Sequence, residues 1–290
     1  MQLPPVARVQ SRRCRQRVAA GLSLVLCGSL LASGASFSQE SKIRKLTGDA
    51  KRGRDLFRRY CIGCHGVEGN GEGENAPYLE IKPRDFTLGL FKCRSTPSGS
   101  IPLDSDLFDT VTRGIPGTFM PSWRPLTPQQ RADLIAYVKT FSVRFHEEKP
   151  ADAVSIPQET PDSPASIERG KVLYRQLGCF ECHGSEGRGD GPSAPTLRDT
   201  KGNISVPYDF TSSPHFKCGP NNSDIYRDVM TGLDGTPMPS YVFWLKPDQA
   251  WDLVHFLRSL AKPETGLTAP IMNSEIAKKD RGKHVESRKP

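Results

Sequence analysis

A short motif that occurs twice constrains this chain more than any other feature. Two cysteines separated by two residues are followed directly by histidine and a glycine-rich segment, in YCIGCHGVEGNGEG from Tyr60 and in GCFECHGSEGRGDG from Gly178. The surroundings recur as well, because residues 105–123 match residues 223–241 at the offset that separates the two motifs. Repetition of a motif together with its context predicts two copies of one structural unit.

Two common explanations for paired cysteines fit this spacing poorly. A structural zinc site usually uses two cysteine pairs about 15–20 residues apart, whereas Cys64 and Cys179 lie much farther apart along the chain. A thioredoxin-like redox site expects a strand before the motif. Residues 48–60 instead have Ala50, Gly53 and later apolar residues at helical spacing after Asp49, a suitable N-cap, so we expect a helix there.

Covalent haem attachment explains the motif directly. Two thiols add to the two vinyl groups of one porphyrin, and the adjacent histidine is left facing the iron. The sequence therefore predicts two covalently bound haem c groups, each with its own iron. The expected attachment residues and iron ligands are Cys61, Cys64 and His65 in the first copy and Cys179, Cys182 and His183 in the second.

Two further positions that recur at the common offset complete the expected sites. Each iron-binding imidazole needs a hydrogen-bond acceptor on its other nitrogen, and the backbone carbonyls of Pro77 and Pro195 are the predicted acceptors. Met120 and Met238 each lie in a proline-flanked turn after a helix, where a thioether can reach the sixth iron position. Methionine more often fills a core, which is the role expected for Met230, but that role would not explain the shared offset.

At these residues the sequence resembles a class I c-type cytochrome, duplicated, over about residues 47–142 and 165–261. The resemblance implies a mostly α fold, with two tandem class I cytochrome c domains joined by a proline-rich linker. In that family the first and last helices of a domain cross beside the haem. The positions that match this crossing are Gly53, Phe57 and Tyr137 in the first copy and Gly170, Tyr174 and Phe256 in the second.

The expected domain boundaries follow from changes in composition. Residues 1–38 have the basic start and apolar stretch of a signal peptide, or of an uncleaved N-terminal membrane anchor. The first cytochrome domain is expected at 42–146, a linker rich in proline at 147–165, the second domain at 166–262, and a basic disordered tail at 263–290.

The net charge of +8 does not indicate a nucleic-acid-binding protein. The excess lies at the two ends of the chain, and the part between them is close to neutral, without a basic stripe interleaved with aromatic residues. The signal-like segment at residues 1–38 predicts export, and hence a periplasmic protein or one anchored in the membrane and facing the periplasm.

Two cysteines remain after the motifs and the signal segment are assigned. Cys93 and Cys218 both lie in the tripeptide Phe-Lys-Cys, so they occupy equivalent positions in the two copies. In an oxidising compartment they can form a disulfide, or they can remain as free or haem-edge thiols. The sequence leaves both alternatives open.

A haem iron held by histidine and methionine has no vacant position for substrate, so electron transfer is the expected role rather than catalysis. The expected partners are redox proteins: a dehydrogenase or quinol-oxidising complex as donor, and a terminal oxidase or mobile cytochrome as acceptor. The alternative is a dihaem enzyme, a peroxidase or sulfur-compound oxidoreductase, in which one iron loses its methionine.

Overall fold

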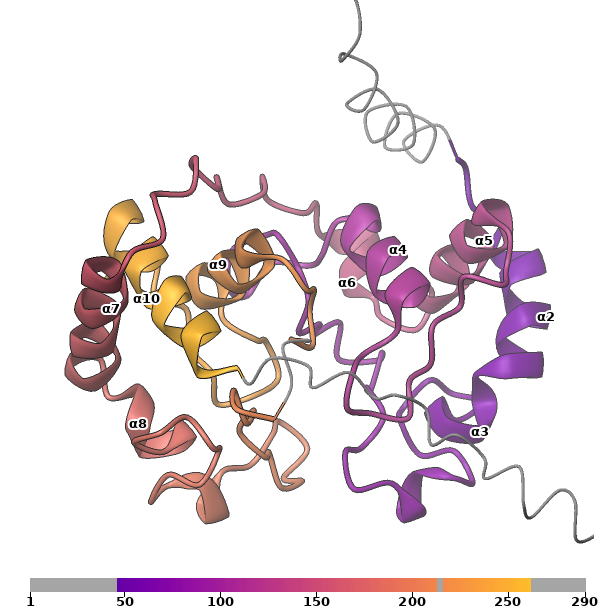
Figure 1. Cartoon of the computed structure of the whole chain (residues 1–290). Helices are drawn as coiled ribbons and strands as arrows, with labels where there is room; N and C mark the ends of the chain where they lie inside the picture. Colours follow the sequence, from indigo (N-terminus) through magenta and orange to yellow (C-terminus); the bar gives the residue numbers. More distant parts are fainter. Residues whose placement is uncertain (1–45, 213–215, 262–290) are drawn as a thin grey trace, which may run out of the picture. The chain divides into compact units, whose positions relative to one another are not determined.

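The computed structural model describes residues 46–212 and 216–261, and these residues form two helical domains (Figure 1). The predicted mostly α fold is confirmed: the described residues contain no strand and only one isolated β-bridge, between Arg198 and Ile204. The segments expected as signal peptide (1–38) and basic tail (263–290) lie outside the described residues. Within the described ranges no helix is long and apolar enough to cross a bilayer.

The first domain consists of six short helical elements connected by long loops. They are α2 (Ala50–Tyr60), α3 (Ile62–His65), η1 (Ala76–Tyr78), α4 (Asp104–Arg113), α5 (Pro128–Lys139) and α6 (Arg144–Glu147). The described part of the second domain repeats the order of the first five elements, with α7 (Pro164–Gln176), α8 (Cys179–His183), η2 (Ala194–Thr196), α9 (Asn222–Thr231) and α10 (Pro247–Leu260). Helix α7 begins two residues before the expected domain boundary.

The helix starts in the first domain follow from the capping residues that the sequence shows. The Asp49 carboxylate accepts hydrogen bonds from the Lys51 and Arg52 amides at the start of α2. At the start of α5, Thr127 and Gln130 form a reciprocal capping box, with Pro128 at the first helical position. These two predictions are confirmed.

Helices α2 and α5 cross closely, as the resemblance implies (Figure 1). A Cβ atom on Gly53 would overlap the backbone oxygen of Asp133, so only glycine allows this approach. The rings of Phe57 and Tyr137 meet beside the crossing with centroids 5.4 Å apart. Arg52 also donates to the Asp133 carboxylate, with Nε at 2.8 Å from Oδ2.

The second domain makes the same crossing between α7 and α10. A Cβ atom on Gly170 would overlap the backbone oxygen of Asp252, and Tyr174 meets Phe256 with ring centroids 5.3 Å apart. The one extra residue before Cys179 therefore leaves this pairing unchanged. Here the Asp252 carboxylate accepts from Arg169 and also from the buried Ser166 hydroxyl, at 2.6 Å.

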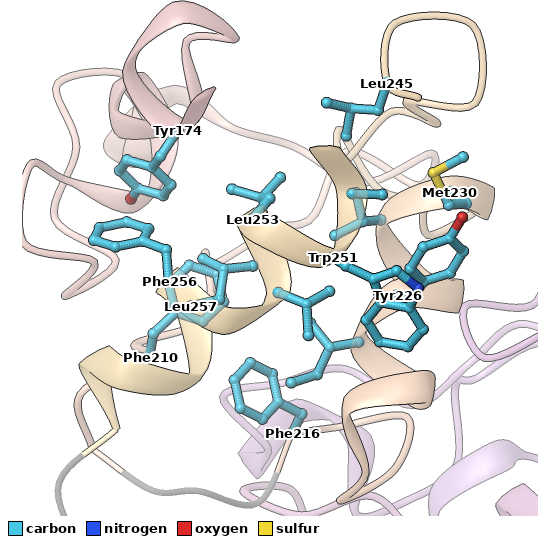
Figure 2. Packing of buried hydrophobic residues seen from close by; sticks show 14 residues of the cluster. Tyr174, Phe210, Phe216, Tyr226, Met230, Leu245, Trp251, Leu253, Phe256 and Leu257 are labelled. Carbon is cyan, nitrogen blue, oxygen red and sulfur yellow. The ribbon is translucent and has the colours of Figure 1, made fainter. Parts of the chain in front are cut away.

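The two hydrophobic cores differ in continuity. The second domain has a single cluster centred on Trp251, in which α10 side chains meet Tyr226 and Met230 of α9 (Figure 2). Met230 is 5% exposed, which confirms it as a core residue. In the first domain the buried residues form two smaller clusters, one around Phe108 and one around Phe57.

The two domains belong to one compact unit, and a disulfide and a buried arginine are among the connections between them. A disulfide links Cys93 to Cys218, which settles the alternative that the sequence left open. Beside it, the fully buried Arg94 donates to the backbone oxygen of Thr231 at 2.7 Å and pairs with Asp234 at 2.8 Å. The residue after Cys218 is glycine, so the second domain has no counterpart of this arginine.

Candidate haem-binding sites

Each cysteine–histidine motif forms a short helix whose reactive side chains line one cavity. In α3 the His65 amide donates to the backbone oxygen of Cys61 at 2.9 Å, which brings the motif into one turn. Cys61, Cys64 and His65 all line the first cavity. In α8, Cys179, Cys182 and His183 line the second.

The predicted methionines line the same two cavities as the motifs. Met120 lines the first cavity, in a loop where its amide donates to the Thr118 hydroxyl oxygen at 3.1 Å and the Ile115 amide donates to its backbone oxygen at 3.0 Å. Met238 lines the second cavity in a loop with the same hydrogen bonds, made by Thr236 at 3.2 Å and by Leu233 at 3.1 Å. The repeated sequence pattern therefore corresponds to a repeated loop conformation.

The backbone holds both imidazoles with one nitrogen free for a metal. His65 Nδ1 lies 3.0 Å from the backbone oxygen of Arg84, and His183 Nδ1 lies 3.1 Å from that of Tyr208. A carbonyl can only accept, so Nδ1 carries the proton and Nε2 keeps its lone pair. Burial lowers the pKa of each histidine, although the carbonyl hydrogen bond opposes this effect, so both rings favour the neutral form that binds metals.

The prediction that Pro77 and Pro195 supply these carbonyls was wrong. Both prolines lie inside 3₁₀ turns, and neither lines the cavity of its own motif. The Pro77 oxygen accepts from the Lys82 ammonium at 3.1 Å, and the Pro195 oxygen accepts from Arg198 at 3.0 Å. These carbonyls are engaged by side chains of their own loops, and a later loop reaches the imidazoles instead.

That later loop carries a second repeated pattern, Pro-x-Asp-Phe-Thr, in addition to the cysteine–histidine motif. It occupies residues 83–87 and 207–211. In both copies the aspartate accepts from the threonine amide and hydroxyl, at 2.9 and 2.6 Å for Asp85. The phenylalanine then stacks on the imidazole, with centroids 4.5 Å apart for Phe86 and His65 and 4.6 Å apart for Phe210 and His183. Recurrence of the pattern at a different offset was the signal that could have revealed it.

The glycine-rich segment after each motif allows its backbone to pack closely against the motif helix. A Cβ atom on Gly73 would overlap the backbone oxygen of Ile62, and one on Gly191 would overlap the oxygen of Glu181. Each glycine therefore lets the following loop pack directly against the motif helix. This close packing fixes the motif helix at the cavity wall.

The donor set of each cavity fits haem c. Two thiols, one neutral imidazole and one thioether line an otherwise largely apolar cavity, and the residues described here hold no cluster of three metal-binding carboxylates, histidines and cysteines. Paired thiols can form two thioether bonds, while imidazole and thioether sulfur are established axial ligands of haem iron. When bound there, haem c supplies reversible one-electron chemistry.

Comparison with known proteins agrees with this geometry. Residues 167–261 match the family model described as cytochrome c, and residues 48–138 match the one described as cytochrome C oxidase, cbb3-type, subunit III. A cytochrome c from Guizotia abyssinica is 32% identical over 99 residues, which cover 32% of this chain and 89% of that protein. The chain belongs to the c-type cytochromes.

Two further comparisons cover a larger share of this cytochrome. A cytochrome c-553-like protein from Synechocystis sp. is 32% identical over 121 residues, covering 41% of this chain and 96% of the relative. Among solved structures, a chain of the reducing HAO-like protein complex from Kuenenia stuttgartiensis is 41% identical, with a TM-score of 0.72, and covers 74% of this chain and 97% of its own. The chain is thus a tandem class I cytochrome with two covalently bound haem c groups.

Proposed function

We propose that this cytochrome is an electron relay, in which two haem groups with histidine and methionine ligands take electrons from one redox protein and pass them to another. The observation that carries the proposal is the occurrence of a histidine and a methionine in the wall of each cavity: His65 with Met120, and His183 with Met238. Two protein ligands leave no iron position for a substrate, while electrons can still pass through the haem edge.

The assigned residues have distinct roles in this proposal. Cys61, Cys64, Cys179 and Cys182 form the thioether bonds. The neutral imidazoles are proximal ligands oriented by the Arg84 and Tyr208 carbonyls, which prevent the rings from rotating away from the iron. The thioether sulfur favours ferrous iron and so raises the reduction potential compared with a second imidazole.

The partners in the proposal are redox proteins rather than small substrates. The similar chain from Kuenenia stuttgartiensis belongs to a protein complex, which supports a role as the cytochrome subunit of an oxidoreductase assembly. The disulfide between Cys93 and Cys218 supports an oxidising compartment, since such bonds persist mainly outside the cytosol. We therefore include export to the periplasm in the proposal, with or without an N-terminal anchor.

A redox titration of the purified protein with added carbon monoxide tests the relay. The expected result is two reversible one-electron steps, low-spin spectra in both oxidation states, and no carbon monoxide binding. The Met120→Ala and Met238→Ala variants should each open one iron, so that each binds one equivalent of carbon monoxide. Carbon monoxide binding by the unmodified protein would instead support the dihaem enzyme, because it requires an open coordination position.

A further inference from the structure

Three half-buried cations gather where the two domains are joined by their disulfide. Lys92 and Lys217 immediately precede the bonded cysteines, and both lysines line both haem cavities. Arg84 lines the first cavity, and its guanidinium lies against the backbone of Gly235 in the loop that leads to Met238. The disulfide thus places cations from both domains between the two sites.

The protein leaves these cations without a direct counter-charge. Among residues 46–212 and 216–261, no carboxylate forms an ion pair with Arg84, Lys92 or Lys217. Other cations in the same region are paired: the buried Arg94 with Asp234 at 2.8 Å, and Lys201 with Asp85 at 3.3 Å. The contrast shows that the region has carboxylates, but that they are directed to other partners.

The electrostatic environment of the three groups is unfavourable for charge. Burial, together with the nearby charges of Arg84 and Lys217, lowers the pKa of Lys92 to about 7. Burial also lowers the pKa of Lys217 and of Arg84, although distant acids such as Asp199 partly oppose the effect on the arginine. Buried charges in proteins are normally paired, so the missing anion has to come from a bound group.

Haem c carries two propionate carboxylates, which supply such anions. We propose that Lys92 and Lys217 bind haem propionates as cations shared by the two sites, with Arg84 as an additional partner at the first site. The proposal rests on the proposed function only in requiring haem in both cavities. It assigns a positioning and potential-tuning role to the two Phe-Lys-Cys segments, which the resemblance left unexplained.

A shared cation should affect both irons. A positive charge near a propionate disfavours ferric iron, which carries one more positive charge than ferrous iron, and so raises the reduction potential. If each lysine served only its own domain, its removal would change one potential. Because both lysines line both cavities, each removal should lower both potentials.

The test measures both reduction potentials in Lys92→Gln and Lys217→Gln, with Lys51→Gln as the control. Lys51 is exposed on α2, away from both cavities, and its loss should leave both steps unchanged. The two steps are assigned with Met120→His, which should lower the first haem's potential alone. Each cavity variant should favour the oxidised form of both haem groups about tenfold, which corresponds to about 59 mV per one-electron step.

Two further measurements separate loss of charge from loss of structure. Lys92→Arg keeps the charge and should retain both potentials, and covalent haem content with an intact disulfide confirms folding of every variant. Infrared difference spectra on reduction should show altered carboxylate bands in the glutamine variants only. A changed reduction potential at one haem alone would show that the cations are not shared. If neither potential changes by more than in the Lys51→Gln control, the proposal is wrong. Carbon monoxide binding by the unmodified protein would count against the electron relay only.

Discussion

The helix crossings of the two domains share the same close contact between the helices but differ in the hydrogen bonds around it. In both, a glycine of the first helix contacts the backbone oxygen of an aspartate in the last helix, and the carboxylate of that aspartate pairs with an arginine. In the second domain only, the buried Ser166 hydroxyl joins Asp252 to His255, whose Nε2 lies 3.2 Å from Glu159 in the linker. The comparison teaches that the glycine contact and the aspartate–arginine pair are the common part of the crossing, while the polar contacts around it differ between the domains.

The largest difference between the two cores lies in one side chain of the last helix. Trp251 precedes Asp252, whereas Ala132 precedes the equivalent Asp133. The indole is 2% exposed and packs against Tyr226 with ring centroids 4.5 Å apart. The continuous core of the second domain therefore depends on a residue that the first domain lacks.

Trp251→Ala should destabilise the second domain by about 3–5 kcal/mol, the usual cost of truncating a buried tryptophan. The first haem should keep its unfolding midpoint, because Trp251 belongs to the core of the other domain. Denaturant unfolding followed through the two haem absorptions measures this effect. Trp244→Ala is the matched control: Trp244 is 73% exposed, and its loss should change stability by less than about 0.5 kcal/mol. Equal destabilisation of both haem domains would contradict the independence of the two cores.

The crossing glycines should respond alike in the two domains. Gly53→Ala and Gly170→Ala each place a methyl group on a backbone oxygen of the opposing helix, which cannot move aside as a side chain can. We expect each substitution to cost about 3 kcal/mol, at the upper end for overpacking, and to disturb only the haem of its own domain. Thermal unfolding of the two haem signals checks both parts. Neither Gly53 nor Gly170 has a positive φ, so the cost of each substitution reports the close approach of the two helices and not a left-handed backbone.

The aspartates at the crossings should make a smaller, pH-dependent contribution. Burial opposes ionisation of Asp133 and Asp252, but hydrogen bonds from Arg52 and Arg169 respectively outweigh it and lower the pKa of each carboxyl group. A lowered folded-state pKa means that the stabilisation is present above the unfolded pKa of about 3.9 and is lost as pH falls through the folded value.

Asp133→Asn and Asp252→Asn should therefore each cost about 1–2 kcal/mol at pH 7 and little at pH 2, since the arginine partners are more than half exposed. Unfolding free energies of the affected domain at the two pH values measure this difference. A cost that stays constant with pH would show that the asparagines disturb packing rather than charge. A larger effect for Asp252 than for Asp133 would identify the added hydrogen bond from Ser166 as stabilising.

Local sequence signals predicted much of the fold. The Asp49 cap, the Thr127 capping box and the core position of Met230 each follow from a residue type at a position with a known local preference. The crossing of the end helices was implied by the resemblance and not by local signals. Its match at Gly53 and Gly170 was confirmed by the structure, despite the inserted residue in the second copy.

Other parts of the sites depend on contacts between distant segments. The carbonyls of Arg84 and Tyr208 carry no sequence label, because any residue has a backbone oxygen, and the recurring prolines indicated a nearer loop. Cys93 and Cys218 occupy equivalent positions in the two repeats, but this equivalence does not say how far apart they lie in space. The sequence therefore left the disulfide as one of two alternatives. The pairing of Arg94 with Asp234 depends on how the domains meet, which neither repeat encodes by itself.

The disulfide also gives the molecule a ring topology. From Cys93 the backbone runs through the linker to Cys218, 125 positions later, and the sulfur–sulfur bond closes the loop. A protease that cut between α6 and α7 would open this ring into one longer chain of two fragments, without releasing either fragment. The nicked cytochrome would migrate as one species until a reductant was added, and both haem groups would stay within the same covalent molecule.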